Sequence, residues 1–454
     1  MVGRFPNRIV QSAALVLILG CLDGSGPLLA PETTVHLVFR VQPSATTPGA
    51  VITPPIVVTI INDVSNRVLP VDTLVRIYSR GWPQSAASLG GTLQVRSIQG
   101  IAMFDDIHVD GVAGGGYTIS AVSDVAVDTA ISDSFSIRFT PAITYNSNNI
   151  PPGLNVEVYG TTLDGSVRVN LTHDSAPDYA GRWSSDGARL LLESYRTGDL
   201  DLYALDSNSL VLTNLTQHAG NDCCGTWFPD GQRVAFLSDR DSDGGREIYV
   251  MNADGSGQTR LTYDSASIYG LITISPDGAQ ILYSAARGSA YSVHVMGADG
   301  SNRITVAADT TPSFAFAWSP NGDQIAFSDG GHLILAQPDG NNRVEIVGDT
   351  VLDSAHAFVA GAVFSPDGSR LAFNWNPGVP QIRPYALTLE VCNIDGSGLK
   401  SLGQGYGGVT EWSRDDAWLL TSYGLEGVKS ISLVRPDGTD GHFLASGFGA
   451  HFRP

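Results

Sequence analysis

Charged residues are scarce in this sequence, and basic residues are the scarcer kind. Only 16% of the 454 residues are charged, and 45 acidic residues outnumber 26 basic ones, for a formal net charge of −19. No basic stripe is present that could hold phosphates, which argues against a nucleic-acid partner. Long apolar runs with the helical period are missing too, whereas Gly (51) and Pro (24) are frequent. The composition therefore favours an all-β protein of short strands joined by turns.

Cysteine is also rare. The chain has four cysteines, of which Cys223 and Cys224 are neighbours and Cys392 is distant. A zinc site needs spaced Cys or His ligands, and these three residues lack that spacing. We expect them to be small buried residues on strands, although a vicinal bridge or a bridge to Cys392 remains open. No metal ion or other cofactor is predicted.

No apolar run in the N-terminal region is long enough to cross a bilayer as a mature helix. The run Ala13–Leu19 follows two arginines and ends in Leu-Gly-Cys, a pattern that suits a secretory signal. This ending resembles a bacterial lipoprotein signal, in which Cys21 would be lipidated and become the new N-terminus; an ordinary cleaved signal is the alternative. We therefore expect a signal peptide over residues 1–21, a tether over 22–32 and membrane contact through a lipid anchor only.

Residues 33–139 contain alternating apolar and polar runs separated by turn-rich segments. This pattern predicts a β-sandwich. The order of the runs resembles the Ig-like repeats of bacterial surface and secreted proteins, which implies a spacer or adhesive unit. The runs cover residues 35–41, 56–62, 73–79, 92–98, 101–109, 117–123 and 134–139.

From Thr140 onward, a repeat of 40 to 48 residues replaces this pattern. In each copy a short run ends in an aromatic or large apolar residue, and a turn of the Pro-Asp-Gly type follows. The second run is apolar. It is followed by a third run, an Asp-Gly turn and a fourth run, which completes the copy. Four strands joined by tight turns form one antiparallel blade that must stack on neighbouring blades. The first turns lie at Ser185, Pro229, Pro276, Pro320, Pro366 and Arg414.

The turn chemistry explains the repetition. Pro presets φ for the first central position of a turn, Asp can bond its own backbone, and Gly accepts a positive φ. The large residue before the turn ends the innermost strand, where it can fill the space between adjacent blades. These residues are Trp183, Trp227, Ile274, Trp318, Phe364 and Trp412.

The second turns indicate one more blade than the complete copies do. The extra blade would take three strands from residues 142–172, and its innermost strand would come from GAHFRP at the C-terminus. We therefore expect a seven-bladed β-propeller over residues 140–454, closed by N- and C-terminal strands that share one blade. The second turns lie at Asp164, Asp254, Asp299, Asp339, Asp395 and Asp437, with a variant at Asp206.

The repeated SPDG…RVAFLSDRD…REIYVMNADGSGQTRLT pattern resembles the propeller repeats of the periplasmic TolB-type family, which have a WD40-like Pro-Asp signature. The resemblance covers residues 140–454 and implies a cell-envelope protein that binds a protein or peptide partner. Similar propellers precede the catalytic domain of some serine peptidases. This chain has no Gly-x-Ser-x-Gly elbow, so a peptidase is not expected.

The loops that link an outermost strand to the next innermost strand should gather around one mouth of the central channel. We expect a polar, acidic and aromatic mouth that binds a basic peptide segment or a cation; alternatively, these residues bond the backbone and fix the blades. No catalytic residue is predicted. The candidates are His173, Asp174, Asp178, Tyr179, His218, Asp222, Tyr263, Asp264, Tyr269, Asp309, Asp353, His356, Tyr406 and, at the end of the chain, His451.

Two other functions stay open. Some polysaccharide lyases use a similar propeller with histidines that hold a metal over the channel, and His173, His218 and His356 could imitate them. A metal-dependent carbohydrate-active enzyme is therefore one alternative. A purely structural unit for surface display is the other.

Overall fold

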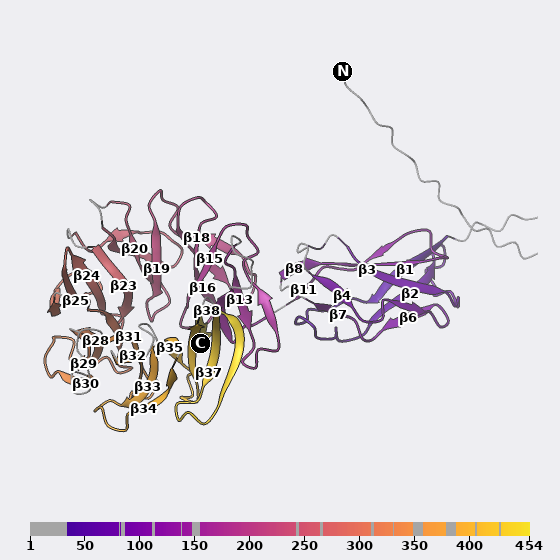
Figure 1. The fold of residues 1–454 in the computed structure, drawn as a ribbon. Coiled ribbons are helices and arrows are strands. Elements are labelled where there is room, and N and C mark those ends of the chain that lie inside the picture. Colours follow the sequence, from indigo (N-terminus) through magenta and orange to yellow (C-terminus); the bar gives the residue numbers. More distant parts are fainter. Residues whose placement is uncertain are drawn as a thin grey trace, which may run out of the picture. The chain divides into compact units, whose positions relative to one another are not determined.

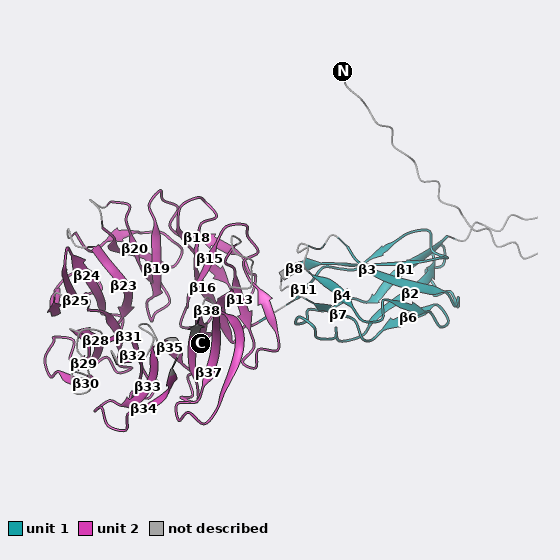
Figure 2. Ribbon diagram, in the orientation of Figure 1, with its two compact units in different colours: residues 1–139 teal, residues 140–454 magenta. Residues whose placement is uncertain are grey.

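The computed structural model describes most of the chain and contains β-strands and turns but no helix in the part described. No helix there is long and apolar enough to cross a membrane. The chain divides into two compact units, Met1–Phe139 and Thr140–Pro454 (Figure 2). The described residues are 34–80, 82, 87–110, 114–137, 139–147, 155–241, 245–263, 267–309, 313–329, 331–347, 357–377, 387–404, 406–425 and 428–454. The predicted signal, lipidated Cys21 and tether lie outside them.

Unit 1 is built from antiparallel strands in two main sheets. One sheet has the order β1-β2-β6 and the other has the order β10-β9-β3-β5, and the pairs β11-β8 and β4-β7 complete the unit. The strands are β1 (Val35–Val41), β2 (Ile56–Asn62), β3 (Leu74–Ser79), β4 (Ser88–Gly90), β5 (Gln94–Arg96), β6 (Ile101–Phe104), β7 (His108–Asp110), β8 (Gly114–Tyr117), β9 (Ile119–Ser123), β10 (Ala130–Ile131) and β11 (Phe135–Ile137).

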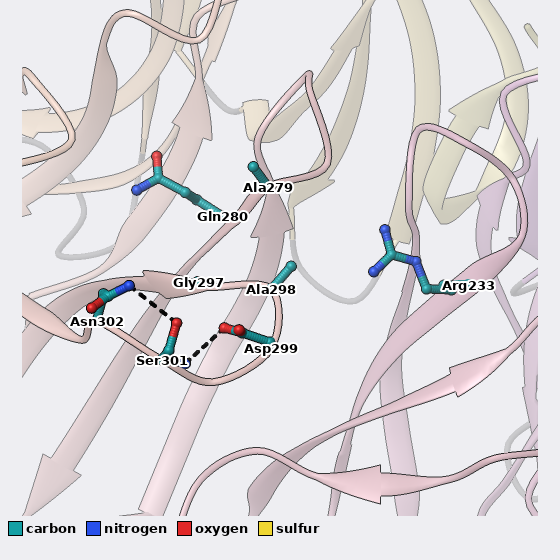
Figure 3. Close-up of a pocket in the computed structure, with 8 residues that line it drawn as sticks. All are labelled: Arg233, Ala279, Gln280, Gly297, Ala298, Asp299, Ser301 and Asn302. Atoms are coloured by element: carbon teal, nitrogen blue, oxygen red, sulfur yellow. Dashed lines mark hydrogen bonds between the residues drawn. The ribbon is translucent and has the colours of Figure 1, made fainter.

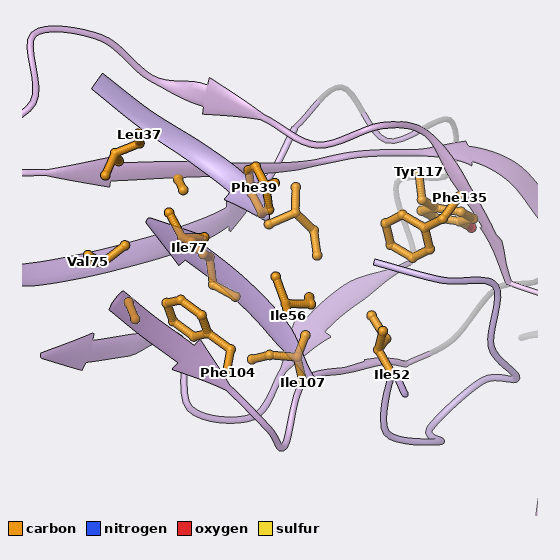
Figure 4. Close-up of a cluster of buried hydrophobic side chains, with 14 of the residues drawn as sticks. Leu37, Phe39, Ile52, Ile56, Val75, Ile77, Phe104, Ile107, Tyr117 and Phe135 are labelled. Carbon is orange, nitrogen blue, oxygen red and sulfur yellow. The ribbon is translucent and has the colours of Figure 1, made fainter. Parts of the chain in front are cut away.

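The two main sheets of unit 1 contribute to one hydrophobic core (Figure 4). Leu37 and Phe39 of β1 alternate with more exposed residues, as Val75 and Ile77 of β3 do. Successive side chains of a strand point to opposite faces, so every second residue reaches the core. This is the alternation that the sequence displays.

One predicted run of unit 1 is divided in the structure. The run at 101–109 forms two strands, β6 and β7, because Asp106 leaves the ladder between them. Its carboxylate accepts hydrogen bonds from the backbone N–H and the hydroxyl of Thr92, at 2.8 and 2.6 Å. These bonds lower the pKa of Asp106, since they favour the charged form. The predicted alternating run is therefore divided between two strands.

The described residues of unit 2 form five four-stranded sheets and one seven-stranded sheet, which together carry the repeat. Each four-stranded sheet takes its strands in chain order. These are β15 (Asp178–Trp183), β16 (Arg189–Ser194), β17 (Asp201–Asp206) and β18 (Leu212–Asn214); β19 (Asp222–Trp227), β20 (Arg233–Ser238), β21 (Glu247–Asn252) and β22 (Thr259–Arg260); β23 (Ser267–Ile274), β24 (Gln280–Arg287), β25 (Ala290–Gly297) and β26 (Ile304–Asp309); β27 (Ala315–Trp318), β28 (Ile325–Asp329), β29 (His332–Ala336) and β30 (Val344–Val347); and β31 (Ala357–Phe364), β32 (Arg370–Pro377), β33 (Thr388–Asn393) and β34 (Lys400–Gln404).

The seven-stranded sheet joins the two ends of unit 2. Its last strand, β38 (Gly441–Phe452), pairs with β37 through its first half and with β12 through its second half, where Phe452 lies opposite Ile143. Figure 1 shows β38, in yellow, beside the magenta strands that begin the unit. The remaining strands are β12 (Ile143–Ser147), β13 (Val158–Thr161), β14 (Arg168–Asn170), β35 (Tyr406–Trp412), β36 (Leu419–Leu425) and β37 (Val428–Val434).

The Pro-Asp-Gly turns take the form that the sequence predicts. In three turns of this type the aspartate (Asp186, Asp277 or Asp367) accepts hydrogen bonds from the backbone N–H two residues later and from the hydroxyl of the serine two residues earlier. These bonds lower the pKa of each aspartate. The glycine that follows has a positive φ, as at Gly187 (φ 66°), which a glycine adopts without steric cost.

The large residues before these turns lie between neighbouring sheets. The indole N–H of Trp227 donates to the carbonyl of Arg182 at 3.2 Å, and Trp318 and Trp412 donate in the same way to the sheets before them. Trp183 reaches β12, where its indole N–H donates to the hydroxyl of Thr144 at 3.2 Å. A buried indole needs such a partner for its N–H. The expected role of these residues is therefore confirmed at the four tryptophans.

Candidate functional site

Two of the predicted mouth residues, Asp178 and Asp222, are fully buried at the first positions of β15 and β19. Each is paired with an arginine that follows the second strand of the same sheet. Arg196 Nη2 lies 2.9 Å from Asp178, and Arg240 Nη2 lies 2.7 Å from Asp222. A buried carboxylate needs such a partner because burial removes its hydration. These two aspartates therefore do not present free negative charge to a ligand.

The pairing forms a repeated unit of three residues. Arg196 Nε donates to Ser194 Oγ at 2.9 Å, and Arg240 Nε donates to Ser238 Oγ at the same distance. The guanidinium of Arg196 also lies over the ring of Tyr203, at 5.1 Å from its centroid. For Asp178 and Asp222, this unit supports the alternative expectation that the candidate residues hold the strands in place.

Three further acids, Glu157, Asp201 and Glu247, are also buried. Asp201 and Glu247 are the first residues of β17 and β21, and Glu157 directly precedes β13. Asp201 accepts hydrogen bonds from Thr216 Oγ1 at 2.9 Å and from Thr197 Oγ1 at 2.6 Å. Glu247 pairs with Arg260 at 3.0 Å. Burial raises the pKa of Glu157, against the effect of its hydrogen bond from the Thr172 hydroxyl. The buried acids of this end of unit 2 are thus bound to neighbouring strands.

The sequence Asn-Leu-Thr, which occurs twice, shapes the loops that carry the predicted histidines. Asn170 Oδ1 accepts the backbone N–H groups of Thr172 and His173, and Asn214 Oδ1 accepts the equivalent two groups in the next sheet. His173 has a φ of 48° as a result of this turn. Asparagine side chains commonly form hydrogen bonds with the nearby backbone and so stabilise turns of this kind. The role of the asparagines was not predicted.

The remaining candidates differ in exposure. His173, His218 and Tyr263 are exposed, and Tyr263, with 73% of its surface accessible, is the most open aromatic residue of the described mouth loops. Asp174 Oδ1 accepts the N–H of Ala176 at 2.8 Å and so closes its own turn. Tyr179, Tyr269, Asp309 and His451 are half-buried. Asp264, Asp353, His356 and the side chain of Tyr406 lie outside what the structure describes.

An aromatic cluster surrounds Tyr269. Its ring makes edge-to-face contacts with Tyr291 and Phe314, at centroid distances of 5.8 and 5.4 Å, and Phe314 stacks with Phe316 at 6.5 Å. The hydroxyl of Tyr269 donates to the Ser313 carbonyl, and burial raises its pKa to about 12. All four rings are half-buried, so the cluster retains accessible apolar surface.

Next to this cluster, β23 contains a bulge. Its register with β24 shifts between Tyr269 and Thr273, and Leu271 within the bulge is 54% exposed. Gly270 has a φ of 75°, and a Cβ there would lie 3.9 Å from Phe314. Register shifts also occur in β15, β19, β27 and β31. Bulges turn side chains out of the ladder, often beside binding sites.

A pocket of about 530 Å³ lies elsewhere, between the second and third four-stranded sheets (Figure 3). Its lining is mostly polar: Arg233, Ala279, Gln280, Gly297, Ala298, Asp299, Ser301 and Asn302. None of the predicted mouth residues lines it. Asp299 accepts the N–H of Ser301 and thereby closes its own turn.

The residues that sequence reasoning missed are Arg196, Arg240 and Arg260, together with Leu271 and Phe314. A signal existed for the first two, because Ser-x-Arg follows the second strand in both sheets, at Ser194 and Ser238. No comparable signal marks Leu271, since its exposure depends on the bulge. Among the described residues, no group of three or more His, Cys, Asp or Glu side chains is arranged to hold a metal ion.

Comparison with known proteins identifies the class of unit 2 as a β-propeller. An oligogalacturonate lyase in complex with manganese is 15% identical, with a TM-score of 0.51 over 66% of this chain and 86% of that one. An oligogalacturonate lyase from Vibrio parahaemolyticus is 13% identical, with a TM-score of 0.51 over 63% and 84%. At these identities the likeness concerns the fold alone.

A match to a protein family gives a more specific description of part of the chain. Residues 123–328 match the TolB beta propeller domain. TolB from Acinetobacter baumannii is 14% identical, with a TM-score of 0.42 over 80% of this chain and 95% of that one. The match to the TolB beta propeller domain thus covers residues 123–328, and the Pro-Asp-Gly-type turns at Pro229, Pro276 and Pro320 lie within it.

Proposed function

We propose that this protein is a non-enzymatic lipoprotein of the cell envelope whose propeller binds a protein or peptide partner. Lipidation at Cys21 would anchor the chain to the membrane, and residues 22–32 would form the tether. Residues 33–139 would serve as an Ig-like spacer. Two sheets that share a single core, including Phe39 and Ile77, support the Ig-like assignment.

The propeller of this proposal has seven blades. Five of the blades are the four-stranded sheets. The seven-stranded sheet forms the other two, because β38 pairs with β37 in one blade and with β12 in the other. Contacts between first strands support this count, because each one touches the next from β15 to β35, and both β35 and β15 touch β38. A closed ring leaves no unpaired edge between its first and last blades.

The accessible apolar surface around Leu271 carries the binding proposal. Leu271 and Tyr263 are exposed, and the half-buried rings of Tyr269 and Phe314 lie beside the bulge. Aromatic residues are enriched at the centres of protein interfaces, where they supply much of the binding energy. The paired state of Asp178 and Asp222 favours an apolar contact over purely acidic recognition.

Substitution of Leu271 tests the proposed surface. Tagged wild-type protein would be cross-linked in cells, extracted from membranes and analysed for bound proteins. We expect Leu271→Ser and Tyr263→Ser to lose the main cross-linked partner, because both side chains are exposed and removing them leaves the core intact. Leu399→Ser is the matched control, since Leu399 is 50% exposed and directly precedes β34, in a different sheet from Leu271. Equal recovery from all four proteins would contradict the proposed surface.

The lipid anchor is tested separately. Cys21→Ser removes the only thiol to which the proposed anchor could be attached, so we expect the variant to move from the membrane fraction to the soluble fraction and to lose labelling by a fatty-acid analogue. Cys392→Ser should leave both properties unchanged. Retention of the label in Cys21→Ser would contradict lipidation at this residue.

A further inference from the structure

The adjacent cysteines of β19 are close enough to react with one another. The Sγ atoms of Cys223 and Cys224 are 2.9 Å apart, although both thiols are free. Cys223 is buried and Cys224 is half-buried. Cys392 belongs to a different hydrophobic cluster from that of Cys223, so it is not the natural partner of either residue.

The backbone at this pair has an unusual conformation. Cys224 has a φ of 59°, in the left-handed region that residues other than glycine rarely occupy. The register of β19 shifts between Cys223 and Thr226, which places Cys224 in a bulge. Gly225 follows, and a Cβ there would lie 3.1 Å from Leu202. The bulge therefore brings the two thiols together on a strand that would otherwise send them to opposite faces.

The neighbouring blade stabilises this conformation. The backbone N–H of Cys224 donates to Glu193 Oε1 at 2.6 Å, and Glu193 lies on β16 of the preceding sheet. This bond ties the bulge to an adjacent blade. The conformation of Cys224 is thus held by a specific contact between two sheets, and is not a property of the dipeptide alone.

The two thiols also differ in character. The hydrogen bond between the two sulfur atoms lowers the pKa of Cys224, while the same bond and burial raise the pKa of Cys223. The positive charge of Arg246 favours the thiolate, and the nearby Glu193 opposes it. The thiolate is the nucleophilic form of cysteine. Cys224 is therefore the less buried residue of the pair, and its thiol is the one more readily converted to the thiolate.

We propose that Cys223 and Cys224 form a modification site, a vicinal dithiol that is oxidised to a disulfide by small-molecule or protein disulfides. The Cys224 thiolate attacks one sulfur of the oxidant, forms a mixed disulfide and releases one thiol. Cys223 then loses its proton to solvent, attacks Cys224 Sγ and releases the second thiol. The two protein thiols lose two electrons and two protons, and the oxidant disulfide is reduced to two thiols.

Oxidation would lock the bulge. A bond between the two Sγ atoms closes a ring through the peptide that joins the residues, so Cys224 could no longer return to an ordinary extended conformation. The N–H of Cys224 would then stay directed at Glu193. The site lies on β19, whereas the proposed partner surface around Leu271 lies on β23 of the next sheet.

The test uses glutathione disulfide and the purified full-length protein. After incubation, free thiols are blocked with iodoacetamide and the peptide that contains both cysteines is analysed by mass spectrometry. We expect this peptide to have lost two hydrogens, to carry neither glutathione nor the blocking group, and to accept two blocking groups after reduction. Stable glutathione on Cys224, or two thiols that remain open to iodoacetamide, would overturn the proposal.

Two variants separate the alternatives. Cys223→Ser removes the resolving thiol, so Cys224 should retain one glutathione as a mixed disulfide. Cys392→Ser should lose the same two hydrogens as the wild-type protein, and failure to do so would show that the bridge involves Cys392 and would overturn the proposal. The decisive measurement is made on the wild-type protein, so it does not depend on the folding of either variant.

Discussion

Removal of residues 447–454 is expected to abolish the cooperative folding of unit 2. This segment forms the second half of β38, which pairs with β12 between Ser147 and Ile143. It also contains Ala450, which is fully buried. Its loss leaves β12 with an unpaired edge, and it removes a set of backbone hydrogen bonds that each contribute about 0.5–1.5 kcal/mol. The total loss should approach the unfolding free energy of a domain, about 5–15 kcal/mol.

Arg453 adds to this effect. Its Nε donates to the Gly187 carbonyl at 2.9 Å, its Nη2 donates to Ser207 Oγ at 3.2 Å, and its guanidinium lies over the ring of Trp183. Arg189 makes equivalent contacts with the next sheet, at Gly231 and Trp227. Arg453 thus links the seven-stranded sheet to the first four-stranded sheet, as Arg189 links the first four-stranded sheet to the second.

Urea unfolding followed by tryptophan fluorescence measures the effect of the truncation. Transfer of residues 447–454 to a position before Thr140, joined to β12 by a turn, is the informative control. It recreates the order of first and second strands found in the four-stranded sheets, so we expect it to recover a cooperative transition. A truncated protein with an unchanged transition would show that the pairing of β38 with β12 contributes little.

Replacement of Arg240 by methionine is expected to destabilise unit 2 by roughly 3–5 kcal/mol, because it leaves the buried charge of Asp222 without its partner. Asp222 is fully buried, and within the described structure its Oδ1 has no hydrogen-bond donor, so Arg240 is the main compensation for its charge. Arg240 also donates to Ser238 and to Gln258. The loss would appear as a lower urea midpoint at an unchanged slope.

Arg233→Met is the matched control for this prediction. Arg233 pairs with Asp230 at 3.1 Å, but both side chains are well exposed, at 38% and 44%. Exposed pairs contribute about 0–1 kcal/mol, so the control should be nearly neutral. The double variant Asp222→Asn with Arg240→Met should recover part of the loss, since neither position of the pair then carries a buried charge. An equal effect of Arg233→Met and Arg240→Met would refute this account.

The sequence predicted the features of unit 2 that depend on a few neighbouring residues. The turns at Asp277 and Asp367 could be recognised because proline, aspartate and glycine each have a local conformational reason to be there. The position of Trp227 between sheets followed from its place before such a turn. These inferences needed no knowledge of which sheets are neighbours.

The candidate site was harder to predict, because burial and pairing depend on distant residues. Topology indicated that Asp178 and Asp222 gather at one end, but their partners follow a different strand, and the pattern Ser-x-Arg does not reveal its target. The exposure of Leu271 results from a bulge, which shifts the register without a clear mark in the sequence. The burial of Asp178 and Asp222 against arginines therefore could not be inferred from the sequence.

The double role of β38 also has a consequence for biosynthesis. Translation proceeds from the N-terminus, so β12 emerges well before its partner β38. Until Phe452 has left the ribosome, the backbone groups along one side of β12 stay open to mispairing. We expect the nascent chain to depend on holding chaperones for that whole interval, and premature termination to yield a product that proteases clear.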